Sequence, residues 1–134
     1  MKDQAAAPAV PPAFEAKLRA YDERLAKAMA MGGADKLARR KAAGVLNARE
    51  RIAYLCDPGS FIESGLFGTS GTNPADQAKT PADGKIAGFG KIDAREAALV
   101  ANDFTVMGSS SAATNGRKIG HLKRVAQRSA LLLG

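Results

Sequence analysis

The stretch KIAGFGKIDAREAALVANDF, residues 85–104, decides the fold of this chain. It holds two strand-like runs, Lys85 to Ile92 and Glu96 to Asn102, separated by a short polar turn at 93–95, and this pattern predicts an antiparallel pair. Five consecutive apolar residues at 97–101 predict that the second strand is buried on both faces. In the first run Ile86, Gly88, Gly90 and Ile92 lie at alternate positions, so the second run is expected to be the more buried strand. A layered α/β domain follows.

Residues 103–134 continue from strand to loop to helix. The loop is Gly108 with three serines at 109–111, and it leaves backbone N–H groups unpaired at a helix N-terminus, where the helix dipole adds partial positive charge. It therefore suits a phosphate or a developing oxyanion. Apolar residues then recur at helical spacing: Ile119, Leu122, Val125, Ala126, Ala130 and Leu133.

Two motifs resemble one enzyme family. Residues 103–110 read DFTVMGSS and resemble the D-F-T-V-x-G-G-S segment in the carboxyltransferases of biotin-dependent acyl-CoA carboxylases, of the propionyl-CoA or methylcrotonyl-CoA carboxylase beta-subunit type. Met31-Gly32-Gly33 and then LNARERIAYLCDPGSFIESGLF, residues 46–67, resemble the family's M-G-G and T-A-R-E-R-I-x-x-L-x-D-P-G-S-F-x-E signatures. The two motifs stand in the family's order at about its spacing, and the likeness runs from Met31 to the end.

The resemblance implies the crotonase-like α/β fold of a carboxyltransferase N-terminal domain, here incomplete and preceded by helices. We expect a disordered Ala/Pro-rich arm at 1–13, a helical segment at 14–56 and the first part of the crotonase-like domain at 57–134. The family's domain is nearly twice as long and continues into an S-G-G-A-R segment that supplies oxyanion-hole amides. This chain alone is therefore expected to transfer no carboxyl group.

The activity implied by the resemblance is transfer of CO2 from carboxybiotin to the α-carbon of an acyl-CoA through an enolate. Two converging N–H donors stabilise such an enolate oxygen without a metal or a catalytic side chain. Biotin would arrive on a partner domain or subunit, with acyl-CoA as the second substrate. The implied partners are biotin carboxylase and biotin carboxyl carrier subunits and further copies of the carboxyltransferase, as a hexamer, in the cytoplasm.

Matching the motif residue by residue places the acyl-CoA contacts in the loop. Gly108 matches the first glycine, Ser109 replaces the second, and Ser110 matches the serine. With Ser111 and the basic pair Arg117 and Lys118, they form the expected CoA-binding set, in which the two cations pair with phosphates. No catalytic side chain is expected in this chain.

Two details depart from the family pattern. The serine at 109 replaces the glycine that permits the tightest backbone approach. Asp93-Ala94 stands where relatives often carry Asn-Gly, so a tight type I′ turn is not expected.

Gly116 and Gly120 lie four apart in the helical segment, which indicates either close approach of another backbone or of the CoA chain, or a helix that begins only after Gly116.

Two alternative functions remain. One is a decarboxylase carboxyltransferase of the same superfamily, of the glutaconyl-CoA type. The other is a non-catalytic basic assembly subunit, because the chain has a net charge of +7 and an apolar stripe on a helix at 14–29 that Gly32-Gly33 would end. The stripe either packs on its own domain or contacts a partner; it consists of Phe14, Leu18, Tyr21, Leu25 and Ala28 or Met29.

Composition argues against several other classes. One His and one Cys do not supply a zinc site, and seven Phe and Tyr residues outside any basic recognition motif argue against nucleic acid. No apolar run approaches the ~20 residues that cross a bilayer. Cys56 is the only cysteine of the sequence, which excludes an intramolecular disulfide and fits a reducing compartment. His121 is expected on a solvated basic face of its helix.

The segment before the strand pair has its own signals. A basic helix is expected at 35–43. Asn47 with Glu50 three residues later predicts a capping box for a third helix. Residues 49–51 are expected to support the fold, as a cap and as solvated or ion-paired arginines, and not to take part in the chemistry. Its inner face is expected to be Ile52, Leu55 and Cys56. Residues 57–60 end it, a short strand is expected at 61–63, and 65–81 should be a surface loop without periodic structure.

Overall fold

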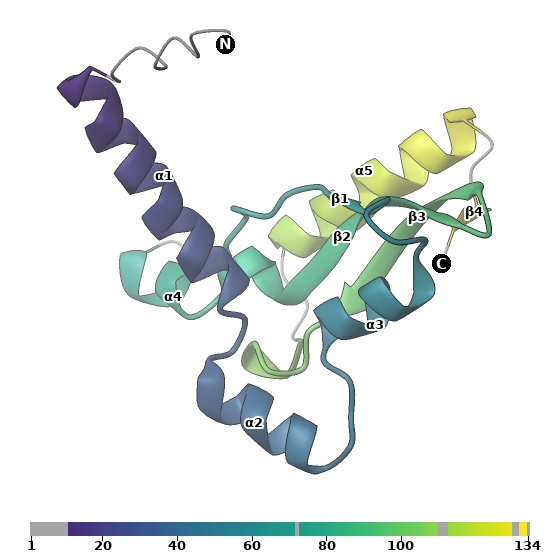
Figure 1. Ribbon diagram of the computed structural model, residues 1–134, viewed down its shortest axis with the longest axis horizontal. Helices are drawn as coiled ribbons and strands as arrows, with labels where there is room; N and C mark the ends of the chain where they lie inside the picture. The colour runs from purple at the N-terminus through teal and green to yellow at the C-terminus, as the bar shows by residue number, and fades with distance from the viewer. Residues whose placement is uncertain (1–10, 72, 110–112, 130–131, 134) are drawn as a thin grey trace, which may run out of the picture.

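The structure is a computed structural model in which residues 11–71, 73–109, 113–129 and 132–133 are described. Its centre is a four-stranded sheet in the order β1-β2-β3-β4 (Figure 1). The strands are β1 (Ile62–Glu63), β2 (Lys85–Ile92), β3 (Arg95–Asn102) and β4 (Leu132–Leu133). The first three pair antiparallel, which confirms the expected strand pair, and β4 pairs parallel to β3.

Helices cover both faces of this sheet (Figure 1). On one face α3 (Ala48–Leu55) packs on alternate residues of β2 and β3, and the buried cluster there includes Ile86 and Leu99. On the other face α5 (Ala113–Ser129) places Leu122 and Ala126 on Ala87 and Ala98. The layered α/β expectation is confirmed, and β3 is buried on both faces as its apolar run predicts.

Strand β2 has five buried residues out of eight and β3 has three out of eight, so the expectation that the second strand would be the more buried one was wrong. Residues 85–88 and Gly90 are all buried, because β1 lies along the other edge of β2 and the helices lie on both faces. A Cβ atom at Gly88 would come within 2.2 Å of the Ile62 carbonyl oxygen. The alternate glycines therefore mark the close approach of β1 and not an exposed face.

The turn between β2 and β3 is a tight two-residue turn, contrary to expectation. Ile92 pairs with Arg95, and Asp93 and Ala94 have φ angles of 48° and 64°, the left-handed pair that a type I′ turn requires. The carboxylate of Asp57 accepts hydrogen bonds from the N–H groups of both turn residues, at 2.9 and 2.8 Å. These two hydrogen bonds, called here the Asp57 anchor, offset the strain of the left-handed Asp93-Ala94 backbone, which an Asn-Gly pair would adopt with less strain.

The segment before the sheet is helical, as expected. Its helices are α1 (Pro12–Met29), α2 (Ala34–Ala42) and α3. The capping box of Asn47 and Glu50 is present. Arg49 pairs with Glu63 of β1, and the Arg51 guanidinium donates to the Asn102 carbonyl at 2.6 Å, so the scaffold role of 49–51 is confirmed.

Three local expectations were wrong. Leu55 is half exposed, because the inner face of α3 follows Ala48, Ile52 and Cys56. The segment 65–81 contains a short helix, α4 (Pro74–Ala78), capped by the Asn73 side chain. Helix α5 ends at Ser129, and the predicted helical position 133 belongs to β4; Ala130 lies outside the described residues.

The glycines of α5 lie inside the helix, since α5 begins at Ala113. The interpretation that the helix starts after Gly116 was therefore wrong. A Cβ at Gly116 would meet nothing within 4 Å, and one at Gly120 would meet only the Arg124 guanidinium at 3.5 Å. The close approach that these glycines permit is not made by any described part of this chain.

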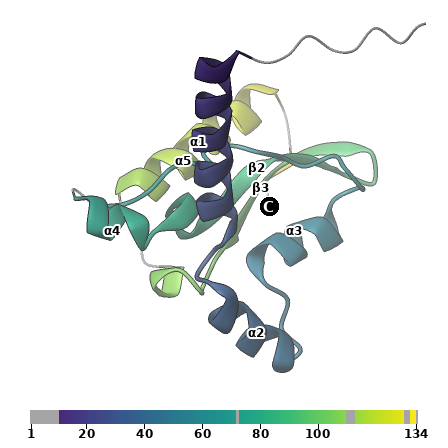
Figure 2. The ribbon, with the colours of Figure 1, turned by 60° about the vertical axis from the view of Figure 1, so that its left-hand side comes forward.

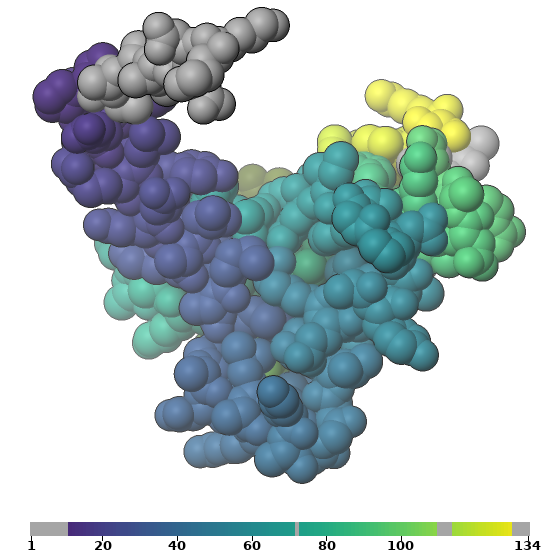
Figure 3. All heavy atoms as spheres, viewed as in Figure 1, coloured from purple at the N-terminus to yellow at the C-terminus, as the bar shows by residue number. Residues whose placement is uncertain are grey.

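Helix α1 stands out from the body, as Figures 2 and 3 show. Its C-terminal half is held by Tyr21, whose ring meets Phe67 edge to face at 5.7 Å, by Arg24 over the same ring, and by the buried Ala28. Further out, Phe14 and Leu18 are 53% and 42% exposed. Among the residues that the structure describes, one end of the apolar stripe packs on its own domain and the other end does not. No helix in the described ranges has the length and apolar character to cross a membrane.

The Asp57 anchor gives a test of the hairpin. Asp57→Ala should lower the free energy of unfolding by about 1–2 kcal/mol, because two turn N–H groups lose a charged acceptor. Ala94→Gly should raise it by about 1 kcal/mol, because glycine takes a left-handed φ without the Cβ penalty. Denaturant unfolding measures both. The control Glu96→Ala removes a nearby exposed carboxylate and should stay within about 0.5 kcal/mol; equal losses for Asp57→Ala and Glu96→Ala would contradict the anchor.

Candidate functional site

Two left-handed turns meet at the end of the hairpin opposite the 93–94 turn. The first is 82–84, with φ angles of 49°, 55° and 64°, and the second is 107–109, with 46°, 59° and 58°. Four of these six residues are not glycine, and each such residue carries strain of about 1–3 kcal/mol. Such strain persists only where surrounding contacts enforce it, and it is concentrated at functional sites.

Lys118 of α5 holds the 82–84 turn. Its ammonium donates to the carbonyl oxygens of Ala82 and Lys85 at 2.8 and 2.6 Å. Burial lowers the pKa of Lys118, and the carboxylates of Glu63 and Asp83 oppose this shift. The helix that covers the sheet therefore also fixes the turn that leads into β2.

Lys85, the first residue of β2, holds the 107–109 turn. Its side chain is buried, with a relative exposure of 6% for the residue. The ammonium donates to the Asn102 side-chain oxygen at 2.7 Å, to the Ser109 hydroxyl at 2.6 Å and to the Ser109 carbonyl at 3.1 Å. All three ammonium N–H groups are therefore used, and one buried side chain links the sheet to the loop before α5.

The two family-like motifs meet beside this turn, although they lie about 70 residues apart. The Gly32 N–H donates to the Thr105 hydroxyl at 2.9 Å, and the Lys36 ammonium donates to the Thr105 carbonyl at 3.0 Å. Asp103 is buried and accepts from the Thr105 N–H at 3.0 Å. A Cβ at Gly32 would lie 2.1 Å from the Thr105 carbonyl oxygen, so only glycine fits there.

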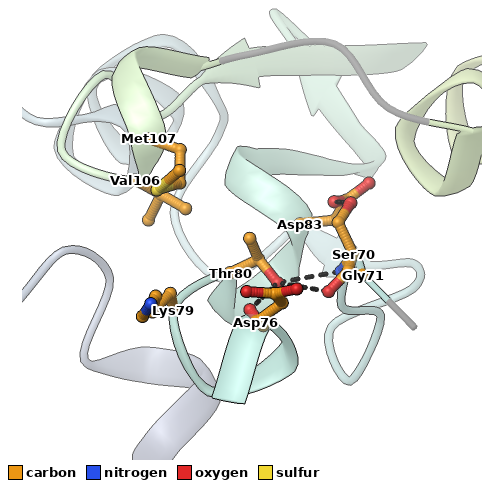
Figure 4. Close-up of a pocket in the computed structure, with 8 residues that line it drawn as sticks. All are labelled: Ser70, Gly71, Asp76, Lys79, Thr80, Asp83, Val106 and Met107. Carbon is orange, nitrogen blue, oxygen red and sulfur yellow. Dashed lines mark hydrogen bonds between the residues drawn. The ribbon is translucent and has the colours of Figure 1, made fainter. Parts of the chain in front are cut away.

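A cavity of about 200 Å³ lies between the two left-handed turns (Figure 4). Val106 and Met107 form one side, and Lys79 and Thr80 lie across from them. Asp83 also lines it, accepting a hydrogen bond from the Ser70 hydroxyl. Strained backbone, buried charge and an open cavity thus occur together.

The predicted CoA-binding residues separate into four groups. Gly108 and Ser109 lie in the 107–109 turn, and Arg117 is exposed on α5. Lys118 points inward onto backbone carbonyls, so its ammonium already has protein partners. Ser110 and Ser111 lie outside the described residues. The Ser109 N–H donates to the Val106 carbonyl at 2.8 Å, so this loop amide is already paired; CoA contact by the set stays a prediction.

Sequence reasoning missed Asp83 and Lys85. Both are charged residues beside or within a strand whose other buried residues are all apolar or glycine. Buried charges occur where they have specific partners. A charged residue flanking such a run is the signal that would have found them.

The carboxyl transferase domain family matches residues 39–132. The chain belongs to this family. It is 36% identical over 108 residues to the propionyl-CoA carboxylase carboxyltransferase subunit of Haloferax mediterranei, covering 79% of this chain and 21% of that protein. It is also 36% identical over 114 residues to methylmalonyl-CoA decarboxylase subunit alpha of Veillonella parvula, covering 84% and 22%. The chain thus spans about a fifth of the length of the curated relatives it matches.

The fold is that of the crotonase-like carboxyltransferases. The transcarboxylase 12S structure, a hexamer with methylmalonyl-coenzyme A bound, superposes with a TM-score of 0.77 at 31% identity. The match covers 91% of this chain and 24% of that one. A single-chain, multi-domain long-chain acyl-CoA carboxylase superposes with a TM-score of 0.78 at 28% identity, covering 93% and 13%.

Burial of Lys118 predicts a pH-dependent stability. Its pKa is lowered in the folded protein, so between that lowered pKa and the ordinary lysine pKa the unfolded chain binds more protons, and the Lys118 contribution to the free energy of unfolding rises with pH. The free energy of unfolding of the wild type should therefore rise relative to that of Lys118→Met as the pH increases from about 7 to about 10. Lys123→Met, an exposed change on the same helix, should parallel the wild type. A constant gap for Lys118→Met would contradict the lowered pKa.

Proposed function

We propose that this chain is the N-terminal part of a carboxyltransferase in a biotin-dependent acyl-CoA carboxylase, which moves CO2 from carboxybiotin to the α-carbon of an acyl-CoA. The observation that carries the proposal is the family match over 39–132, with the family's D-F-T-V-x-G motif forming the left-handed 107–109 turn that precedes α5. Strained turns of this kind are typical of ligand-binding sites. The bound methylmalonyl-coenzyme A of transcarboxylase 12S supports an acyl-CoA ligand.

The chain's contribution is to bind and orient acyl-CoA. The N-terminal end of α5 carries the positive end of the helix dipole, and the exposed Arg117 lies near it. Phosphates of CoA pair with such a guanidinium through charge-assisted hydrogen bonds. Biotin is treated as a substrate brought by a carrier subunit, charged by a biotin carboxylase subunit, and no residue of this chain is assigned to it.

Enolate stabilisation is assigned elsewhere in the protein. An enolate oxygen needs N–H donors aimed at it, and the Ser109 N–H is already bonded to the Val106 carbonyl. The 107–109 turn is therefore a positioning element in this proposal. No side chain of this chain is assigned a catalytic role.

A decarboxylase is the second candidate, because the Veillonella parvula relative is named as a methylmalonyl-CoA decarboxylase subunit. Both reactions share the transfer between acyl-CoA and biotin. The full-length protein with its partner subunits separates them: ATP-dependent fixation of labelled bicarbonate into acyl-CoA supports the carboxylase. Loss of CO2 from a carboxyacyl-CoA, with no fixation, supports the decarboxylase.

The exposed outer half of α1 fits a subunit contact within an oligomer. Phe14 and Leu18 are half exposed at the end of the helix that leaves the body, and transcarboxylase 12S is described as a hexamer. We place the protein in a homo-oligomer, and in a reducing, cytoplasmic setting that suits the unpaired, buried Cys56.

Arg117 gives the direct test of CoA binding. In the full-length enzyme, Arg117→Ala should raise the Michaelis constant for acyl-CoA about threefold to tenfold. Saturated turnover should stay nearly unchanged, because a phosphate contact far from the reacting carbon binds ground and transition states alike. Steady-state kinetics with the acyl-CoA varied measures both.

The control is Arg128→Ala, which removes an exposed arginine from the last turn of the same helix. It should leave both constants at wild-type values. An unchanged Michaelis constant for Arg117→Ala, in a correctly assembled enzyme, would assign this face of α5 to solvent.

A further inference from the structure

We propose that Lys85 is the positioning residue of the 107–109 turn, and that its buried ammonium does for Ser109 what a second glycine does in the D-F-T-V-x-G-G-S motif. The proposal concerns how a serine at 109 keeps the left-handed backbone that a glycine would adopt freely. It rests on the proposed function only where it predicts an effect on acyl-CoA.

The backbone at 109 supplies the first observation. Ser109 has a φ of 58°, in the left-handed region that glycine occupies freely and a serine occupies only at a cost. The preceding residues 107 and 108 are left-handed as well, with φ angles of 46° and 59°. A serine therefore keeps the glycine conformation here, and some contact must hold it in place.

Lys85 supplies that contact at two atoms of the same residue. Its ammonium lies 2.6 Å from the Ser109 hydroxyl oxygen and 3.1 Å from the Ser109 carbonyl oxygen. The carbonyl bond orients the peptide that leaves the turn, and the hydroxyl bond fixes the side chain. Glycine has no hydroxyl to offer, so the second bond exists only because the residue is serine.

Burial of Lys85 is the second, independent observation. A buried ammonium is costly unless its donors are satisfied, and all three donors here are used on Asn102 and Ser109. Its hydrogen-bond acceptors are neutral, and no carboxylate forms an ion pair with it among the described residues. A strand that is otherwise apolar at its buried positions thus carries a lysine whose loop contacts are all made with Ser109.

The position of Lys85 explains how the turn stays aligned with the sheet. The carbonyl of Lys85 accepts from the Lys118 ammonium at 2.6 Å, while its own ammonium reaches the 107–109 turn. Helix α5, the start of β2 and the turn are therefore joined through one residue. Loss of the Lys85 side chain should free the turn without breaking the backbone pairing of β2 with β3.

The test is a double-mutant cycle between Lys85→Met and Ser109→Gly in the full-length protein. Lys85→Met should speed hydrogen exchange in the peptide containing residue 109 by about tenfold and raise the Michaelis constant for acyl-CoA by a similar factor, with turnover within about twofold. With Ser109→Gly present, adding Lys85→Met should change both by less than about twofold, since glycine keeps the turn without help. Lys91→Met, an exposed lysine on the same strand, is the control.

A second pair of variants leaves Lys85 in place, in case Lys85→Met folds poorly. Ser109→Ala and Ser109→Gly both remove the hydroxyl, but only alanine retains the left-handed strain. Faster exchange and a higher Michaelis constant for Ser109→Ala than for both the wild type, which keeps the hydroxyl bond to Lys85, and Ser109→Gly, which lacks the strain, support the proposal.

Three outcomes are decisive. Equal effects of Lys85→Met with and without Ser109→Gly would overturn the positioning role and leave Lys85 as a general scaffold residue. Identical behaviour of Ser109→Ala and Ser109→Gly would overturn it as well. If Lys85→Met and Ser109→Gly are coupled in hydrogen exchange but the Michaelis constant does not change, Lys85 positions the turn, and the contact of the turn with acyl-CoA is overturned.

Discussion

Burial of β2 and β3 on both faces is the constraint on which the rest of the structure depends. With α3 on one side and α5 on the other, polar groups of the strand pair reach partners only along its edges and at its two ends. Both ends consist of left-handed residues. At each end a charged side chain from a distant segment satisfies backbone groups that the turn leaves unpaired.

The sign of each charge matches the backbone groups it meets. At the 93–94 turn two N–H groups face inward, and the Asp57 carboxylate accepts from both. At the opposite end carbonyl oxygens face inward, and the ammonium groups of Lys118 and Lys85 donate to them. The first end closes the hairpin. The second carries the family motif and the cavity, so the same device there fixes a candidate binding turn.

Much of the fold could be predicted from sequence because its signals are local. The apolar run at 97–101, the capping box of Asn47 and the Gly/Ser loop before a helix each act within a few residues. The type I′ turn could not be predicted, because its stabilising partner, Asp57, lies 36 residues away in sequence. Burial of β2 could not be predicted for a related reason. Its Gly88 allows β1 to lie close against it, and no local pattern in β2 shows that β1 lies there.

The candidate site divides in the same way. Gly108 and Ser109 follow from the motif, but the role of Lys85 depends on a contact across 24 residues that no local pattern encodes. Lys118 was expected at a phosphate, and its ammonium bonds to the carbonyl oxygens of Ala82 and Lys85, a contact with residues more than 30 positions away that no local pattern encodes. Its contact with CoA stays a prediction. Gly32 was recognised as part of a motif, and its fit against Thr105 gives that motif a physical reason.

A structure of the full-length protein with an acyl-CoA bound would show directly whether the 107–109 turn belongs to the binding site. We expect CoA to contact this turn and the Arg117 side of α5, with Lys85 still bonded to Ser109. A ligand bound elsewhere on the protein, with the 107–109 turn and Arg117 facing solvent, would contradict it.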